Sequence, residues 1–92
     1  MLKLQFKDKS RPDRWLVDSL ITIGSDPSCD IVINSSQVAP HHAELVVRDN
    51  LIEFVHKASS KSSFVNGQLI AINIELKAWD VIKIGEAEME LI

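Results

Sequence analysis

Three histidines and one cysteine in this sequence have side chains that commonly bind metal ions, and the cysteine is also a candidate nucleophile. His41 and His42 are adjacent, and neighbouring residues of an extended chain point to opposite faces, so the pair is poorly placed to share one ion. His56 lies beyond a strand-like segment and is predicted to be solvated. Cys29 has no second cysteine beside it, which favours a packed thiol over a ligand or a nucleophile. The sequence therefore predicts no metal site.

Catalysis and nucleotide binding also lack a supporting motif. Serine, histidine and aspartate all occur in the expected loops, but the Gly-x-Ser-x-Gly turn that presents a nucleophilic serine is absent. The sequence has three glycines, and none of them belongs to a glycine-rich phosphate loop. We therefore predict that the chain is not an enzyme and uses no cofactor.

Length and charge limit the remaining functions. A chain of 92 residues, 46% of them hydrophobic, fits a single domain over residues 1–92 with one core. Its formal net charge of -3 does not supply the concentrated positive field that nucleic-acid backbones and anionic membrane surfaces attract. No apolar run approaches the roughly 18 residues that a membrane span needs. Neither nucleic acid nor direct membrane contact is expected.

The N-terminus and the cysteine content favour the cytoplasm. Residues 1–7 alternate apolar and polar side chains, which is typical of a strand and not of a secretion signal. A single cysteine rules out an internal disulfide and suits a reducing compartment. We expect a cytoplasmic domain, either free or part of a membrane-anchored protein.

Alternation with a period of two residues dominates the sequence and predicts β-strands. Leu2, Leu4 and Phe6 face one way at the N-terminus, and the glutamates of residues 86–91 point to solvent at the C-terminus. Further strands are predicted at Leu20–Ile23, Ile31–Ile33, Ala43–Val47, Leu51–Val55 and Val81–Ile84. We predict an all-β sandwich of two antiparallel sheets, with about ten or eleven short strands and with the terminal strands close together.

Turn-forming residues support this arrangement. Asp49-Asn50 separates two apolar runs and suits a tight hairpin, and Asn66-Gly67 supplies residues that tolerate positive φ. The serine-rich stretch 59–63 is predicted to be a surface loop, because strand-like sequence resumes on either side of it.

The order of the motifs resembles the forkhead-associated (FHA) domain from about Leu20 to Ile92. The resemblance rests on five segments that follow the family order, at 21–24, 29–33, 42–45, 64–67 and 76–85. Trp79, within the last segment, stands where the family usually has glycine. The resemblance implies an FHA-type sandwich, in which loops at one end capture phosphothreonine on a partner protein.

The resemblance also implies structural roles for four residues. His42 would be the buried histidine whose ring hydrogen-bonds the backbone of neighbouring loops. Gly24 is expected where the chain leaves a strand sharply, since glycine accepts every backbone conformation. Asn66 and Gly67 would form the turn at the end of the fourth segment.

The residues that contact phosphate in that family are mostly replaced. Ser25 stands where the family has an arginine, the side chain best suited to hold a phosphate dianion. The family's loop serine is here Ala39 and the following arginine is Pro40, and neither side chain can donate a hydrogen bond. The next signature is also altered, and its three positions are occupied by Lys61, Ser62 and Ser63.

Substitute ligands for phosphate remain in the same loops. Ser25, Ser63 and backbone amides can donate hydrogen bonds, and Lys61 or a protonated His41 can supply positive charge. Two functions therefore stay open: phosphate-independent docking, which better accounts for the lost ligands, and phosphothreonine reading through the substitutes. In either case the expected partner-binding residues are Ser25, Asp26, Ala39, Pro40, His41, Lys61, Ser62 and Ser63.

Two short strings resemble one subgroup of the family more closely. Gly-Ser-Asp-Pro at 24–27 and Val-Ala-Pro-x-His at 38–42 are similar to the cytoplasmic FHA-like domain of the inner-membrane-ring protein of type III secretion systems. Members of that subgroup also lack the arginine and the serine, and they are understood as protein-docking modules. The resemblance implies a scaffold role in a bacterial assembly, with another protein or peptide, phosphorylated or not, as the partner.

Overall fold

The computed structural model describes residues 2–49 and 51–92, and this part of the chain consists of β-strands and connecting loops. Its strands are β1 Lys3–Phe6, β2 Arg14–Trp15, β3 Leu20–Gly24, β4 Ile31–Val32, β5 Ala43–Arg48, β6 Leu51–His56, β7 Ser63–Val65, β8 Gln68–Leu69, β9 Asn73–Leu76, β10 Val81–Ile84 and β11 Ala87–Leu91. Within the described residues, no helix is long and apolar enough to cross a membrane.

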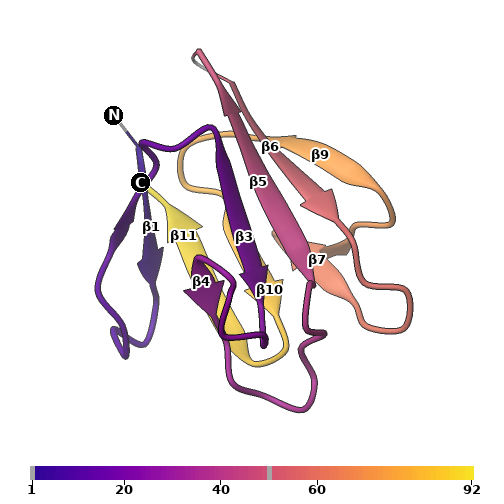
Figure 1. The fold of residues 1–92 in the computed structure, drawn as a ribbon. Coiled ribbons are helices and arrows are strands. Elements are labelled where there is room, and N and C mark those ends of the chain that lie inside the picture. Colours follow the sequence, from indigo (N-terminus) through magenta and orange to yellow (C-terminus); the bar gives the residue numbers. More distant parts are fainter. Residues whose placement is uncertain (1, 50) are drawn as a thin grey trace.

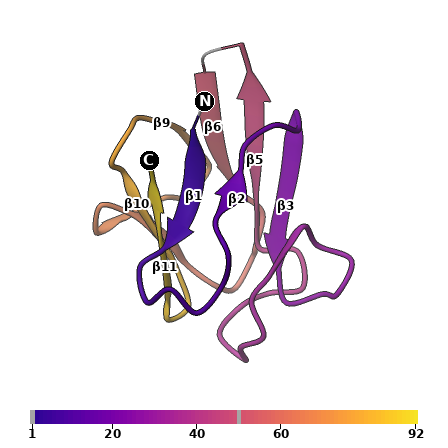
Figure 2. The same ribbon diagram turned by 90° about the vertical axis from the view of Figure 1, so that its left-hand side faces the viewer.

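The strands form two sheets that pack face to face (Figures 1 and 2). The six-stranded sheet has the order β2-β1-β11-β10-β7-β8, and the five-stranded sheet has the order β4-β3-β5-β6-β9. The terminal strands β1 and β11 pair antiparallel, with Leu4 opposite Leu91. The predicted all-β sandwich and the predicted neighbourhood of its terminal strands are confirmed.

One edge of the five-stranded sheet differs from the prediction of purely antiparallel pairing. β3 and β4 run parallel, with Ile23 opposite Ile31. The reason lies in Asp30, whose carboxylate accepts hydrogen bonds from the backbone N–H and the hydroxyl of Thr22, at 2.9 and 3.1 Å. The loop after β3 thus folds back, and β4 starts beside β3 in the same direction.

The core lies between the two sheets, because the period-two alternation turns every second side chain inward. In β5 and β6 the inward residues include Leu45 and Phe54, which are completely buried. Burying one such side chain contributes about 1.5–3 kcal/mol. The other fully buried apolar side chains come from both sheets and are Leu4, Ile21, Ile23, Ile82, Ile84, Met89 and Leu91.

Sequence periodicity found seven of the eleven strands in the described residues, namely β1, β3, β4, β5, β6, β10 and β11. Three of the missed strands, β2, β7 and β8, have only two or three residues, which is too short for an alternation to show. The fourth, β9, does alternate polar and apolar residues and was overlooked. The Asn66-Gly67 hairpin is confirmed: it joins β7 and β8, with φ values of 53° and 81°. In the other predicted hairpin Asp49 has a φ of 50°, while Asn50 lies outside the described residues.

Trp79 occupies the turn between β9 and β10 with a φ of 75°, a conformation that suits glycine. Its side chain is 66% exposed, so burial does not compensate for the strain. A bulky residue in this backbone region costs on the order of 1–3 kcal/mol. The turn keeps its left-handed geometry although the glycine is replaced.

Candidate functional site

Three loops come together at the end of the sandwich where β3 and β6 end, in the lower half of Figure 1. They are the β3–β4 loop, the β4–β5 loop and the β6–β7 loop, and they contain all the expected partner-binding residues except Ser63. The backbone N–H groups of Ser25 and Asp26 donate to the carbonyls of Ala39 and Pro40, at 3.0 and 3.2 Å. The first two loops are therefore held together by backbone hydrogen bonds.

His42 ties the third loop to the other two. Its side chain is completely buried, as predicted. Nδ1 accepts the backbone N–H of Ala39 at 3.1 Å, and Nε2 lies 3.0 Å from the carbonyl oxygen of Ser62. Because Nδ1 is an acceptor, Nε2 carries the proton and donates to Ser62. The neutral imidazole thus satisfies one polar group in each of two loops.

His56 is not solvated, contrary to the sequence-based expectation. It is the last residue of β6 and is half-buried, with its Nδ1 2.8 Å from the hydroxyl oxygen of Ser63. Its ring meets that of His42 edge to face, with 5.7 Å between the ring centroids. The two imidazoles form a small polar cluster beneath the loops.

Ser63 was expected in the partner-binding surface, and the structure excludes it from that surface. The residue starts β7 and is completely buried, and its hydroxyl is engaged with His56. Residues 59–62 lie in the predicted surface loop, and Lys61 and Ser62 within them are exposed. The sequence pattern failed here because the β7 strand begins at the last serine of the run.

Gly24 is required for a reason other than the expected one. Its φ is not positive, so backbone freedom does not explain the glycine. A Cβ atom placed on Gly24 would lie 2.0 Å from the carbonyl oxygen of Pro40 and 3.0 Å from Sγ of Cys29. The glycine therefore allows the β4–β5 loop to approach the end of β3 closely.

Asn66 and Gly67 lie away from the three loops, where they support the six-stranded sheet. The side-chain amide of Asn66 donates to Asp80 at 2.9 Å, and its side-chain oxygen accepts the N–H of Val81 at 3.0 Å. This hairpin fixes the position of β7 beside β10 and makes no direct contribution to the loop surface.

The surface that the loops present to a partner is small and nearly neutral. Pro40, His41 and Lys61 are exposed, while Ser25 and Ala39 are half-buried. A hollow of about 240 Å³ opens beside them, lined by Gln37, Ser60, Lys61, Ser62, Phe64 and Gly85. Sequence reasoning did not single out Gln37, Phe64 or Gly85 for binding, although Phe64 lies within a family segment.

Asp26 places a carboxylate among these loops. Its oxygen accepts the N–H of Ser28 at 2.8 Å, and hydrogen bonds from Ser28 hold the pKa of the carboxyl below its ordinary value of 3.8. The neighbouring His41 favours the same charged form. A negative charge therefore stands beside Pro40, in the region where an incoming phosphate dianion would need positive charge.

The described residues contain no group of three or more histidine, cysteine, aspartate or glutamate side chains that could hold a metal ion. Cys29 is buried, and its thiol donates to the carbonyl of Pro40 at 3.2 Å. Burial raises the pKa of this thiol above its ordinary value. The cysteine therefore packs the β3–β4 loop against Pro40 and stays protonated near neutral pH.

The stability of the domain is expected to fall as the pH drops below about 6.5. Burial lowers the pKa of His42 from its ordinary value of 6.5. As the pH falls below 6.5, the unfolded chain therefore binds a proton at this residue before the folded state does. The contribution of His42 is therefore complete above pH 6.5 and is lost toward lower pH. The measurement is the denaturant midpoint between pH 7.5 and pH 5.

The matched control for this pH effect is the neighbouring exposed histidine. His41→Asn should keep the loss of stability between pH 7.5 and pH 5, and His42→Asn should flatten it. Hydrogen bonds hold the pKa values of Asp8, Asp26 and Asp30 below 3.8, so these three carboxyl groups titrate outside this window. An equally steep profile in His42→Asn would contradict the assignment.

Solved FHA domains share this architecture. The FhaA FHA domain, complexed with the intracellular domain of Rv3910, matches with a TM-score of 0.91 at 21% identity, covering 100% of both chains. The FHA domain of the CT664 protein from Chlamydia trachomatis gives 0.89 at 23% identity, over 99% of this chain and 95% of that one. The N-terminal FHA domain of S. cerevisiae Rad53p with a phosphothreonine peptide gives 0.85 at 18%, over 98% and 90%. At these identities the likeness shows the fold.

The sequence itself identifies the family. No curated protein matches it significantly. A family model described as the cytoplasmic domain of the inner membrane component of the type III secretion system (T3SS) matches residues 8–92. This match covers β2 to β11 and all three loops of the site. The chain therefore belongs to the family of FHA-like cytoplasmic domains of the T3SS inner membrane component.

Proposed function

We propose that this domain is a non-enzymatic docking module that binds another protein of a bacterial secretion assembly without requiring phosphate. The observation that carries the proposal is the chemistry of the β3–β4 and β4–β5 loops. Position 25 offers a serine hydroxyl, and Ala39 and Pro40 offer no side-chain donor. The backbone carbonyls of Ala39 and Pro40 already accept hydrogen bonds, from the N–H groups of Ser25 and Asp26 and from the thiol of Cys29.

The missing donors matter because phosphate capture depends on charge-assisted hydrogen bonds. Each hydrogen bond to a charged group contributes about 1.5–3 kcal/mol. Loss of the family's arginine and serine together corresponds to a roughly hundredfold or greater loss of affinity. Among the proposed contact residues, positive charge can come from Lys61 and from His41 when it is protonated, and the carboxylate of Asp26 opposes it.

The exposed loop residues suit contact with a protein. Pro40 is rigid, Ala39 and Ser62 are small, and His41 and Lys61 are polar at the rim. Because Ser63 is buried, the proposed contact residues are Ser25, Asp26, Ala39, Pro40, His41, Lys61 and Ser62. Family membership supports a cytoplasmic position as part of a membrane-anchored protein.

Phosphorylating a threonine peptide is expected to improve its affinity for this domain by less than about tenfold, since only Lys61, His41 and neutral donors sense the added charge. Isothermal titration with a phosphothreonine peptide library and its unphosphorylated counterpart measures the difference. Tight and phosphate-dependent binding by the wild type would refute the proposal.

A gain-of-function variant provides the matched comparison. Ser25→Arg with Ala39→Ser restores a guanidinium fork and a hydroxyl at half-buried loop positions and leaves the strands unchanged. Its preference for the phosphorylated peptides should exceed that of the wild type by about tenfold or more. Unfolding midpoints show whether the variant remains folded, and a folded variant without this preference would mean that the loops are not aligned as proposed.

The alternative function, phosphothreonine reading through substitute ligands, rests on one specific feature. The hollow beside the loops is lined by Lys61, Ser60 and Ser62, which can donate hydrogen bonds to an anion. The same titration separates the two functions. In the alternative, the wild type prefers the phosphorylated peptides by more than about tenfold and Lys61→Ala removes most of that preference, whereas in the docking function the wild-type preference is already below about tenfold.

A further inference from the structure

A hollow of about 340 Å³ opens along one side of the sandwich, between the chain that joins β1 to β2 and the strand β4. Its lining residues are Phe6, Arg11, Pro12, Asp13, Arg14, Asp30, Ile31 and Val32. β2 and β4 are edge strands of the two different sheets, so the hollow lies where the sandwich is open at its side. Its volume falls within the range of ligand pockets, about 300–1,000 Å³.

The floor of this hollow is apolar, because core side chains reach it from both sheets. Phe6 of β1 and Ile31 of β4 are 4% and 5% exposed. The guanidinium of Arg11 lies over the Phe6 ring, with 5.2 Å between Cζ and the ring centroid. This stacking holds the guanidinium beside the hollow, and the N–H donors at its planar edge remain available to a carboxylate.

The carboxylates that line the hollow are matched by partners within the domain. Asp13 pairs with Lys3 at 2.7 Å. Asp30 accepts hydrogen bonds from the backbone N–H and the hydroxyl of Thr22, and it also lies 3.9 Å from Arg14. Neither carboxylate is therefore free to pair with Arg11.

Positive charge without a partner is concentrated at the same place. In the part of the chain that the structure describes, no ion pair involves Lys7, Lys9 or Arg11. Residues 7–14 carry four basic and two acidic side chains, a formal charge of +2, whereas the other residues carry six basic and eleven acidic ones, a formal charge of -5. One side of an acidic domain thus attracts negative charge.

The strand β4 offers an open backbone edge to this hollow. Among the described strands it pairs only with β3. Successive residues of a strand turn their N–H and C=O groups to opposite sides. Ile33 donates its N–H to the carbonyl of Gly24 at the end of β3, at 2.8 Å. The preceding residue, Val32, therefore presents its N–H and C=O away from β3, where another strand can pair with them.

We propose that this hollow binds an acidic segment of a partner protein, which lies in extended conformation beside β4. A carboxylate of the segment pairs with the guanidinium of Arg11 through charge-assisted hydrogen bonds. An apolar side chain of the segment points toward Phe6 and Ile31. The backbone of the segment hydrogen-bonds Val32, as in other cases of strand addition to a sheet edge.

The open edge of β4 favours a peptide over a small anion as the occupant. An anion such as phosphate can accept the N–H of Val32 but leaves its C=O unpaired, whereas a peptide backbone satisfies both groups. None of the lining residues belongs to the proposed contact residues of the three loops. The inference therefore does not depend on the loop function.

Nuclear magnetic resonance of the ¹⁵N-labelled domain tests the proposal, with a terminally blocked octapeptide of alternating glutamate and valine as the probe. The expected dissociation constant is about 0.1–1 mM at low salt, with shifts centred on the amides of Phe6, Arg11 and Val32. A peptide of alternating lysine and valine should bind at least about tenfold more weakly. Shifts centred on residues 25–26, 39–41 and 61–62 instead would overturn the proposal.

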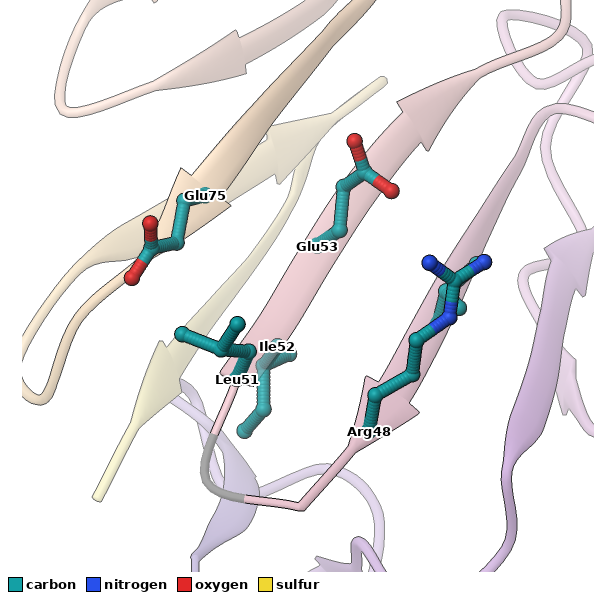
Figure 3. Close-up of a pocket in the computed structure, with 6 residues that line it drawn as sticks. Arg48, Leu51, Ile52, Glu53 and Glu75 are labelled. Atoms are coloured by element: carbon teal, nitrogen blue, oxygen red, sulfur yellow. The ribbon is translucent and has the colours of Figure 1, made fainter.

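Charge reversal at the arginine gives the second arm. Arg11→Glu should weaken binding of the acidic peptide at least about tenfold. The matched control is Arg48→Glu, because Arg48 is exposed beside a separate hollow that Glu53 and Glu75 also line (Figure 3), and it should leave the affinity unchanged. Unfolding midpoints confirm that each variant is folded. An equal loss in both variants would show a general charge effect and overturn the proposal.

N-methylated peptides test the backbone pairing without changing the domain. One octapeptide is methylated on every glutamate nitrogen and the other on every valine nitrogen, and only one of these two sets can face β4. One peptide should therefore lose affinity at least about tenfold relative to the other. Equal affinities of the two, or an Arg11 shift with inorganic phosphate as large as with the acidic peptide, would overturn the proposal and leave the loop function untouched.

Discussion

Gly24→Ala is expected to destabilise the domain by about 3 kcal/mol, the upper part of the range for overpacking a closed site. The added methyl carbon would lie 2.0 Å from the carbonyl oxygen of Pro40, which is backbone and cannot rotate away. That carbonyl also accepts bonds from Asp26 and Cys29, so moving it breaks both. Chemical denaturation at neutral pH measures the change in unfolding free energy.

Gly67→Ala is the matched control, because glycine is needed at position 24 to avoid a steric clash and at position 67 to allow a positive φ. Gly67 has a φ of 81° and open space around its Cβ position, so alanine there brings strain without a clash. Its expected cost is about 1 kcal/mol. A smaller effect at Gly24 than at Gly67 would show that the β4–β5 loop can move away from β3.

His42→Ala should destabilise the domain by about 2–4 kcal/mol. The substitution removes the partners of the Ala39 N–H and the Ser62 carbonyl and leaves a cavity beneath the loops. Since about 1 kcal/mol corresponds to a change of 4–8 °C for a domain of this size, the melting temperature should fall by about 10 °C or more.

The control for this second substitution is the adjacent His41→Ala. His41 is exposed, and a surface substitution of this kind usually changes stability by no more than about 0.5 kcal/mol. Amide hydrogen exchange locates the effect, since loss of His42 should expose the N–H groups of residues 39 and 57–58 before those of the β5 strand. Equal melting temperatures for both variants would refute the bracing role of His42.

The sequence by itself determined the fold class and the family. Period-two alternation in β1, β5, β6, β10 and β11 is a local property, because the side chains of a strand alternate wherever the strand lies. The order of the short motifs sufficed for the FHA resemblance, which the family match and the solved structures confirm. The Asn66-Gly67 hairpin was equally readable, since few residues adopt its positive φ values.

The position of each loop side chain could not be read from the sequence, because burial depends on what other segments place around it. Ser62 and Ser63 are neighbours of the same type, yet one is exposed and the other is completely buried against His56. The predicted reason for the glycine at position 24, backbone freedom, was wrong. Its need arises from Pro40, which only the folded chain brings to within 2.0 Å of the Cβ position.

Tertiary structure also decided which surfaces can act together. Arg48 and Glu75 are distant in sequence, and they line the same hollow only because β6 pairs with β5 on one side and with β9 on the other. The parallel pairing of β4 depends in the same way on Asp30 reaching Thr22. Local patterns specify which face of a strand is apolar, whereas strand pairing over long sequence separations specifies which exposed residues become neighbours.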